Sequence, residues 1–255
     1  MIYKVPFVNY PLQYYNLEKE IDATIKRVLK KGDLILRSDV EEFEKNMANF
    51  VGTKYAIGVN SCTDALIFSL KTAGIKKGDE VITVSHTFFS TLEVIVHCGA
   101  KPILIDVGED FVMDVTKINE AITSKTKAVI PVHLNGHMCD MEKLVAIAKK
   151  NNLIVIEDAA QALGAKQSGK TAGSFGFTGC FSFYPAKILG AFGDAGAVVT
   201  NQEETAEKIR LLRNHGQKTK TEIVLYGFTS RLHNIQAAIL NAKFQYLEQW
   251  IRRRR

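Results

Sequence analysis

Short apolar runs alternate with stretches of helical periodicity along most of the chain. The runs are rich in Val and Ile and nearly continuous, which is typical of strands buried on both faces of a sheet. We predict strands at 80–84 (EVITV), 101–106 (KPILID), 127–132 (KAVIPV), 153–158 (LIVIED), 179–183 (GCFSF) and 196–200 (GAVVT). Helical periodicity predicts helices over 40–52, 139–152 and 205–216. The alternation predicts an α/β fold with a mostly parallel sheet.

One predicted strand, 153–158, ends in the two acids Glu157 and Asp158, and Gln161 follows three residues later. In an open parallel sheet, ligands bind beyond the carboxyl ends of the strands, so these side chains are candidates for a binding site. Asp is also a favoured helix cap, and acids suit a helix N-terminus. Position alone leaves the ligand site and the helix cap equally open.

A candidate anion site lies at 58–70 (GVNSCTDALIFSL), where Ser61, Cys62 and Thr63 precede an apolar helix. Free backbone N–H groups and hydroxyls at a helix start can bind phosphate, although Ser61 or Thr63 would also serve as a plain helix cap. The patterns GxGxxG after a strand and GxxxxGK[ST] are missing from the sequence. Their absence argues against a dinucleotide oxidoreductase and a P-loop nucleotidase.

Lys187 stands between an apolar run and a series of glycines, in CFSFYPAKILGAFGDAGAVV at 180–199. This lysine, Asp158 and a helix-start phosphate site are together the parts that pyridoxal phosphate requires. A lysine binds the cofactor as a Schiff base, an acid keeps the pyridine nitrogen protonated, and N–H groups hold the phosphate. The combination predicts a pyridoxal phosphate site.

Composition and charge restrict the possible partners. The chain has 255 residues, 46% of them apolar, which is enough for a full core. Its net charge of +6 includes the arginine run 252–255, and no basic stripe with interleaved aromatics occurs elsewhere, so we expect no nucleic-acid partner. The sequence also shows neither a signal peptide nor an apolar run long enough to span a membrane.

The cysteines match neither a zinc-site spacing nor the disulfide framework of a small secreted domain. They are Cys62, Cys98, Cys139 and Cys180. We therefore expect reduced thiols in a soluble, cytoplasmic protein with no membrane partner.

The motifs resemble those of the DegT/DnrJ/EryC1/StrS family of pyridoxal-phosphate-dependent sugar aminotransferases, both in their residues and in their order along the chain. The resemblance runs from about residue 6 to the end of the sequence. It rests on VEEFE, NSCTDAL, GDEVIT, TFFST, GAKPILIDV, PVHLNG, EDAAQALGA, FSFYPAK, GDAGAVVT, RNHG and SRLHNIQAAIL. It implies an aspartate-aminotransferase-like large domain, which is fold type I among pyridoxal phosphate enzymes, with a mostly parallel central sheet.

The resemblance also implies roles for individual residues. Lys187 matches the Schiff-base lysine, which moves the substrate proton between two carbons. Asp158 matches the acid that pairs with the pyridine nitrogen, and Gln161 matches the residue near the ring hydroxyl. These three residues are the predicted chemical centre of the site.

Further matches concern the ring face and the phosphate. Phe88 matches the aromatic residue that stacks on the ring, although a core phenylalanine is the plain alternative and is what we expect for Phe89. Ser182 matches a phosphate-binding hydroxyl. Cys62 and Thr63 match the phosphate loop at the helix start.

Three features depart from the family pattern. Many relatives have glycine in place of Cys62, so a side chain must fit beside the phosphate. Many have asparagine in place of Thr229, where it reaches the phosphate of the partner subunit, and we leave Thr229 outside the predicted site. Relatives also continue into a small C-terminal domain. We therefore expect residues 1–245 to form the cofactor-binding large domain, and 246–255 to begin the connection to a small domain that this chain lacks.

The function implied by the resemblance is transamination with pyridoxal 5′-phosphate. An amino group would pass from glutamate to the keto carbon of a nucleotide-linked sugar. Two alternatives remain open, a pyridoxal-phosphate-dependent sugar dehydratase and an inactive, truncated dimerising remnant. Dehydratases of the family carry histidine in place of the lysine, so Lys187 argues against the first alternative.

The resemblance further implies a homodimer with its active sites at the interface. A stripe of apolar residues on a predicted helix either contributes to that interface or packs in the core of one chain. The stripe consists of Ile235, Ala238, Ile239, Ala242 and Leu247.

Overall fold

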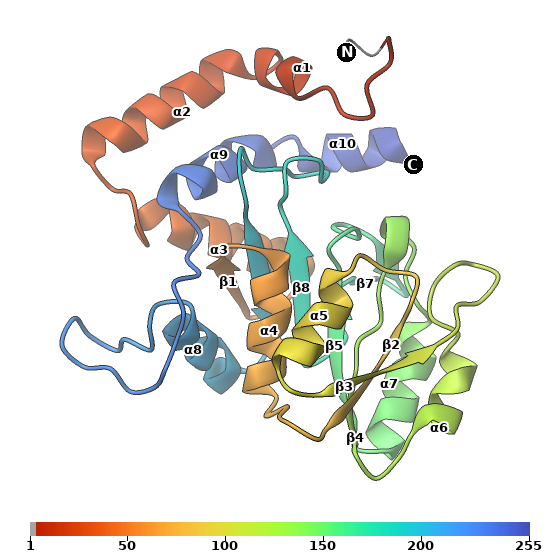
Figure 1. Cartoon of the computed structure of the whole chain (residues 1–255). Coiled ribbons are helices and arrows are strands. Elements are labelled where there is room, and N and C mark those ends of the chain that lie inside the picture. Colours follow the sequence, from red (N-terminus) through yellow and green to blue (C-terminus); the bar gives the residue numbers. More distant parts are fainter. Residues whose placement is uncertain (1–3) are drawn as a thin grey trace.

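The computed structural model describes residues 4–255, so the first three residues of the predicted large domain lie outside the described part. A seven-stranded sheet lies at the centre, with helices on both of its faces (Figure 1). Its strands are β1 (Tyr55–Val59), β2 (Glu80–Val84), β3 (Lys101–Ile105), β4 (Thr126–Val129), β5 (Ile154–Asp158), β8 (Thr178–Ser182) and β9 (Gly196–Thr200). A small hairpin pairs β6 (Lys166–Gln167) with β7 (Lys170–Thr171).

The strands lie in the order β1-β9-β8-β5-β4-β2-β3. The pairs from β8 to β3 are parallel, whereas β9 runs antiparallel to both of its neighbours, β1 and β8. The predicted α/β fold with a mostly parallel sheet is therefore confirmed. The predicted strand 127–132 is cut short at Val129, and Pro131, which has no N–H to donate, follows soon after.

The helices are α1 (Tyr10–Tyr15), α2 (Glu18–Lys31), α3 (Ser38–Val51), α4 (Cys62–Thr72), α5 (Ser90–His97), α6 (Ile118–Ala121), α7 (Met141–Lys150), α8 (Glu203–Leu212), α9 (Asn234–Phe244) and α10 (Leu247–Arg254). Two short 3-10 turns, η1 (Val115–Lys117) and η2 (Leu134–Gly136), complete the described elements. The three predicted helices correspond to α3, α7 and α8. None of the helices described between residues 4 and 255 has the length and hydropathy that crossing a bilayer requires.

Alternating side chains of the central strands build two of the core layers. Phe181 and Val199 belong to the layer that contains α3 and α9, while Cys180 and Val198 face the layer that contains α4. This alternation is the expected result of a strand buried on both faces. It fixes α4, whose first turn is a predicted part of the site, against one face of the sheet.

The predicted apolar stripe, which lies on α9 and at the start of α10, is used mainly within the chain. Ala238 and Ile239 are each 2% exposed, Leu247 is fully buried, and α9 packs against α2 and α3. Ordinary core packing therefore accounts for the stripe, and it gives no support to the predicted dimer. The predicted domain division at residue 245 stays a prediction.

Candidate active site

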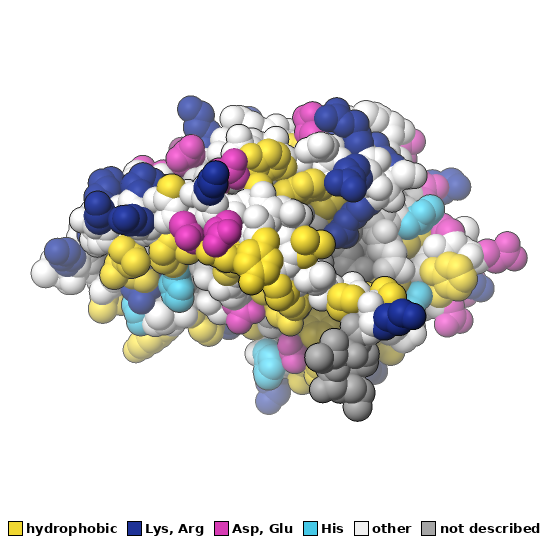
Figure 2. Space-filling model, turned by 90° about the horizontal axis from the view of Figure 1, so that it is seen from above, with side chains coloured by type: hydrophobic (Ala, Val, Ile, Leu, Met, Phe, Trp, Pro, Cys, Tyr) yellow, Lys and Arg dark blue, Asp and Glu magenta, His cyan; other side chains and the backbone are white. Residues whose placement is uncertain are grey.

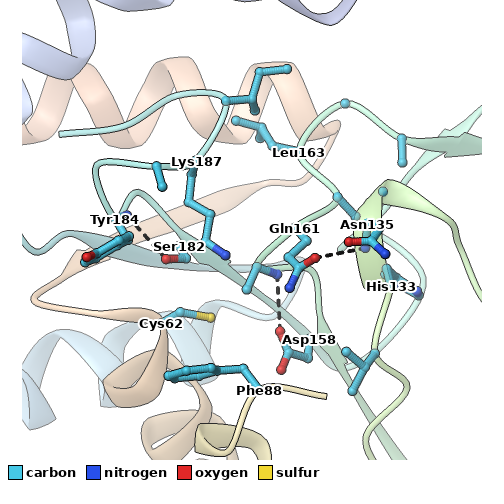
Figure 3. A pocket seen from close by; sticks show the side chains of 18 of the residues that line it. Cys62, Phe88, His133, Asn135, Asp158, Gln161, Leu163, Ser182, Tyr184 and Lys187 are labelled. Carbon is cyan, nitrogen blue, oxygen red and sulfur yellow. Dashed lines mark hydrogen bonds between the residues drawn. The ribbon is translucent and has the colours of Figure 1, made fainter. Parts of the chain in front are cut away.

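A cavity of about 1010 Å³ opens beyond the carboxyl ends of β5 and β8 (Figure 3). Every residue of the predicted site lines it. These residues are Cys62, Thr63, Phe88, Asp158, Gln161, Ser182 and Lys187. They come from the start of α4, the segment before α5, the end of β5 and the turn after it, the end of β8 and the loop after β8. The structure thus brings the predicted residues together, while their individual roles stay predictions.

Lys187 lies on a loop that leaves the sheet and returns to it. The loop is closed by a hydrogen bond from the Ala191 N–H to the Phe183 carbonyl, 2.8 Å, and the Lys187 N–H donates to the Tyr184 carbonyl, also 2.8 Å. In Figure 3 the lysine side chain extends from this loop into the cavity. The turn after β8 therefore presents the amine to a ligand.

Helix α9 holds the far side of the same loop. The Gln236 side chain donates to the Phe192 carbonyl and accepts from the Phe192 N–H, both at 2.9 Å. The buried Lys243 donates from Nζ to the Gly190 carbonyl. These contacts fix the backbone on the C-terminal side of Lys187.

Asp158 is buried at the end of β5, with 5% of its surface exposed. Its carboxylate accepts hydrogen bonds from Thr91 Oγ1 at 2.8 Å and from the Ala160 N–H at 3.2 Å. Burial raises the pKa of Asp158, and these two hydrogen bonds oppose that effect. The helix-cap interpretation is wrong, because β5 is followed by turns and not by a helix.

The adjacent acid, Glu157, has a different environment. Its carboxylate accepts from backbone N–H groups at 2.7–2.8 Å, and those donors are Gly173, Phe175 and Gly176. His133 Nε2 lies 3.1 Å from it, and both side chains are fully buried. Since the Cys139 N–H donates to His133 Nδ1, the ring proton sits on Nε2 and is donated to Glu157. Glu157 thus holds the sheet end together and does not line the cavity.

The start of α4 provides free donors for an anion. Ser61 is the helix cap, because its hydroxyl accepts from the Asp64 N–H at 3.1 Å. The N–H groups of Cys62 and Thr63 make no hydrogen bond to any described residue. Gly196 packs directly against this turn, where an added Cβ would lie 2.3 Å from the Ser61 carbonyl carbon. Glycine at this position therefore lets β9 approach the helix start.

Cys62 lines this end of the cavity as a buried thiol. Burial raises its pKa well above the ordinary thiol value, and the Asp158 charge acts in the same direction. The thiol is therefore protonated at neutral pH and is a poor nucleophile.

The remaining lining residues offer polar atoms and an aromatic face. Gln161 Oε1 accepts from the Asn135 N–H at 2.9 Å, which fixes the side-chain amide. The Ser182 hydroxyl accepts from the Tyr184 N–H at 3.3 Å and keeps its own proton for another acceptor. Phe88 is 72% exposed, so it is not a core residue. The expectation of a core residue at Phe89 is wrong, because that side chain is 66% exposed.

This donor set fits pyridoxal phosphate. Asp158 is a buried carboxylate with no ion-pair partner within 4 Å among residues 4–255, and a protonated pyridine nitrogen would supply one. The first turn of α4, Thr63 and Ser182 would hold the phosphate, and Phe88 would cover the ring. Lys187 supplies the amine.

The structure adds residues that the sequence patterns did not indicate. Thr91 bonds to Asp158, and Asn135 orients Gln161. No sequence pattern signalled the first of these contacts, because Thr91 lies in the first turn of α5 and Asp158 at the end of β5, far apart in the sequence. Thr229, left outside the predicted site, bonds to His215 Nε2 at 2.8 Å and is not part of the cavity lining.

Comparison with known proteins decides the family. The sequence profile of the DegT/DnrJ/EryC1/StrS aminotransferase family matches residues 15–255. The chain belongs to this family. The DegT/DnrJ/EryC1/StrS enzymes depend on pyridoxal phosphate, in agreement with the donor set of the cavity.

Relatives within the family match nearly the whole chain. A pleiotropic regulatory protein from Geobacillus stearothermophilus is 44% identical over 98% of this chain and 68% of its own length. The dTDP-3-amino-3,4,6-trideoxy-alpha-D-glucose transaminase of Streptomyces venezuelae is 42% identical over 98% of this chain and 66% of its own length. The chain therefore spans about two thirds of these DegT/DnrJ/EryC1/StrS relatives.

A solved structure agrees in fold and cofactor. The crystal structure of NtdA from Bacillus subtilis, with bound cofactor PMP, superposes with a TM-score of 0.91 at 36% identity. The match covers 98% of this chain and 57% of the NtdA chain. The aspartate-aminotransferase-like fold of the DegT/DnrJ/EryC1/StrS family is thereby confirmed for the described residues.

Proposed function

We propose that the chain carries the active site of a transaminase that moves an amino group from glutamate to the keto carbon of a nucleotide-linked sugar. The observation that carries the proposal is the convergence of Lys187, Asp158 and the first turn of α4 on one cavity in a chain of an aminotransferase family. The Streptomyces relative is a dTDP-3-amino-3,4,6-trideoxy-alpha-D-glucose transaminase by name, which supports the sugar substrate.

The residues of the cavity have separate roles in such a reaction. Bound pyridoxal phosphate supplies an electron sink that stabilises negative charge on the substrate carbon. Asp158 holds a proton on the ring nitrogen through its carboxylate, and Lys187 carries a proton on Nζ between the two carbons that exchange the amino group. The Cys62 and Thr63 N–H groups bind the phosphate and fix the position of the ring. Lys187 argues against the dehydratase alternative.

The mouth of the cavity suits an anionic substrate. Arg254 and Arg255, at the end of α10, are among the lining residues, and Arg255 also donates to the Gly164 carbonyl at 3.1 Å. In Figure 2, Lys and Arg side chains border the hollow on this face. Two guanidinium groups are a favourable environment for a diphosphate.

The arm between α8 and α9, residues 216–228, supports a homodimer. It projects from the body of the protein (Figure 1) and exposes a group of large apolar side chains. Their exposed fractions are 65% for Ile223, 50% for Val224, 101% for Tyr226 and 40% for Phe228. A second copy of the chain would bury them. We also keep the cytoplasm as the expected compartment.

The proposal is tested with protein loaded with pyridoxal phosphate. Glutamate should remove the visible absorbance of the wild-type complex and release 2-oxoglutarate, because Lys187 transfers the substrate proton. A panel of nucleotide-linked ketosugars is then screened by mass spectrometry for conversion of the ketone to an amine. The Lys187→Ala variant should show neither the absorbance band nor amino transfer. A deoxygenated sugar in place of an amino sugar would instead establish the dehydratase alternative.

A further inference from the structure

Two threonine hydroxyls form a chain that ends on the Asp158 carboxylate. Thr91 Oγ1 donates to Asp158 Oδ2 at 2.8 Å, and Thr87 Oγ1 lies 2.7 Å from Thr91 Oγ1. A hydroxyl can donate only one hydrogen bond, and Thr91 donates it to the carboxylate. Thr87 must therefore be the donor to Thr91. The chain has a fixed direction, from Thr87 through Thr91 to Asp158.

The two ends of this chain differ in burial. Thr91 is fully buried in the first turn of α5, whereas Thr87 lines the cavity beside Phe88. The pair of hydroxyls thus connects the segment that carries Phe88 to the Asp158 carboxylate at the end of β5. Hydrogen bonds in series polarise and strengthen one another, so the bond from Thr87 strengthens the bond from Thr91 to Asp158.

The direction of donation matters because Asp158 is buried. An ionised carboxylate only accepts hydrogen bonds, whereas a protonated one also carries an O–H donor and is a weaker acceptor. Hydrogen bonds to the charged form favour that form, and they count for more where water is excluded. The hydroxyl chain therefore acts against the tendency of a buried carboxyl group to be neutral.

We propose that Thr91, supported by Thr87, is a positioning residue that holds Asp158 ionised and oriented for the ring nitrogen of the cofactor. The inference rests on the proposed role of Asp158 in the transaminase site. Neither threonine is assigned to substrate or to proton transfer. Their effect reaches the cofactor through the carboxylate.

Elsewhere in the protein, Thr83 provides a matched control. This residue is also fully buried, and its hydroxyl donates at 2.9 Å to the Ile130 carbonyl, not to a carboxylate. Thr→Val at either position removes one buried hydroxyl and changes the shape very little. Only the change at position 91 removes a donor from Asp158.

The test measures affinity for pyridoxal phosphate by equilibrium dialysis. Thr91→Val should weaken binding by about 10-fold or more, because a hydrogen bond to a buried charged group is worth roughly 1.5–3 kcal/mol. Thr87→Val should give a smaller loss in the same direction. Thr91→Ser, which keeps the hydroxyl, should restore wild-type affinity, and Thr83→Val should leave it unchanged. Thermal unfolding of the cofactor-free variants checks that each one folds.

A second ligand separates this role from simple packing. In an analogue of pyridoxal phosphate with carbon in place of the ring nitrogen, Asp158 has no cation to pair with, so Thr91→Val should cost little affinity. Equal losses for both ligands, or equal affinities of Thr91→Val and Thr83→Val for pyridoxal phosphate, would overturn the inference while leaving the transaminase proposal in place. If the wild-type protein bound no pyridoxal phosphate, both proposals would fail.

Discussion

Two neighbouring acids at the end of β5 have opposite environments because successive side chains of a strand point to opposite faces. Glu157 is surrounded by backbone donors and His133, whereas Asp158 faces the cavity with Thr91 and Ala160 as partners. The strand alternation therefore separates a structural acid from one that is available to a ligand.

This separation leads to a prediction for Asp158→Asn. The amide oxygen can keep the bond from the Ala160 N–H, so the turn after β5 and the thermal midpoint should change little. Turnover should fall by orders of magnitude, because a neutral amide cannot balance the charge of a protonated ring nitrogen. Rates of the half-reaction with glutamate and thermal unfolding measure the two effects. A large loss of stability with unchanged rates would show that Asp158 is only structural.

A second prediction concerns the thiol beside the phosphate end of the cavity. Because burial raises the pKa of Cys62, the thiolate is scarce at pH 7 to 8 and the sulfur takes no part in chemistry. Cys62→Ser should therefore retain amino transfer within a few-fold of wild type. Alkylation by iodoacetamide followed by peptide mass spectrometry should modify the half-buried Cys98 before Cys62. Rapid labelling of Cys62 with loss of activity would contradict this interpretation.

For individual residues, the sequence predicted which side chains lie together at the cavity but only some of their neighbours. The order of motifs placed Lys187, Asp158 and the α4 start at one edge of a sheet, since the carboxyl ends of parallel strands meet there. The exposure of Phe89 and the bond from Thr91 depend on how α5 packs. No local pattern specifies that packing.

Among the elements, helix α9 supports the loop of Lys187 with a buried cation. Lys243 is 4% exposed, donates to the Gly190 carbonyl, and lies 5.1 Å from the ring centre of Phe192. Burial lowers the pKa of Lys243 to about 8. The helix thus holds the loop at a cost in stability whenever the lysine is charged.

That cost predicts a pH dependence of stability. Below pH 8, Lys243 is protonated in both the folded and unfolded states, so the full cost of burying its charge is present. As pH rises from 8 towards the unfolded value of about 10.4, the folded state loses its proton first and becomes relatively more stable. Any stability advantage of Lys243→Met over wild type should therefore shrink between pH 7 and 10.

Denaturant unfolding at several pH values measures this difference. Lys149→Met provides the control, because it also removes a lysine side chain, but from the exposed surface of α7. A difference between Lys243→Met and wild type that stays constant with pH would contradict the prediction.

Prediction of the elements succeeded for most strands of the central sheet but missed the edge strand β1. The run 55–59 (YAIGV) was not predicted as a strand, yet it pairs with β9 along its whole length. The strand β9 was predicted, but an apolar run carries no information on direction. Its antiparallel orientation depends on the loop that carries Lys187 between β8 and β9.

For the whole molecule, we predict that the protein is a homodimer held in part by the arm at 216–228. Ile223→Asp combined with Tyr226→Asp should convert the dimer into a monomer, because charged groups would replace exposed apolar ones at the contact. Light scattering at micromolar concentration measures the change. Leu104→Asp is the control, since Leu104 is 50% exposed on the distant edge strand β3. A wild-type monomer would contradict the proposal.

The position of β9 between β1 and β8 has a consequence for synthesis on the ribosome. The start of α4 emerges early, but β9, whose Gly196 packs against it, emerges only after β2, β3, β4, β5 and β8. Until then, the edges of β1 and β8 that face each other across the missing strand are unpaired. A nascent chain that stopped before residue 196 would already contain Lys187, Asp158 and the first turn of α4, yet it would lack the strand that closes the sheet beneath them. We therefore expect a nascent chain to bind the cofactor only after β9 has emerged and paired with both β1 and β8.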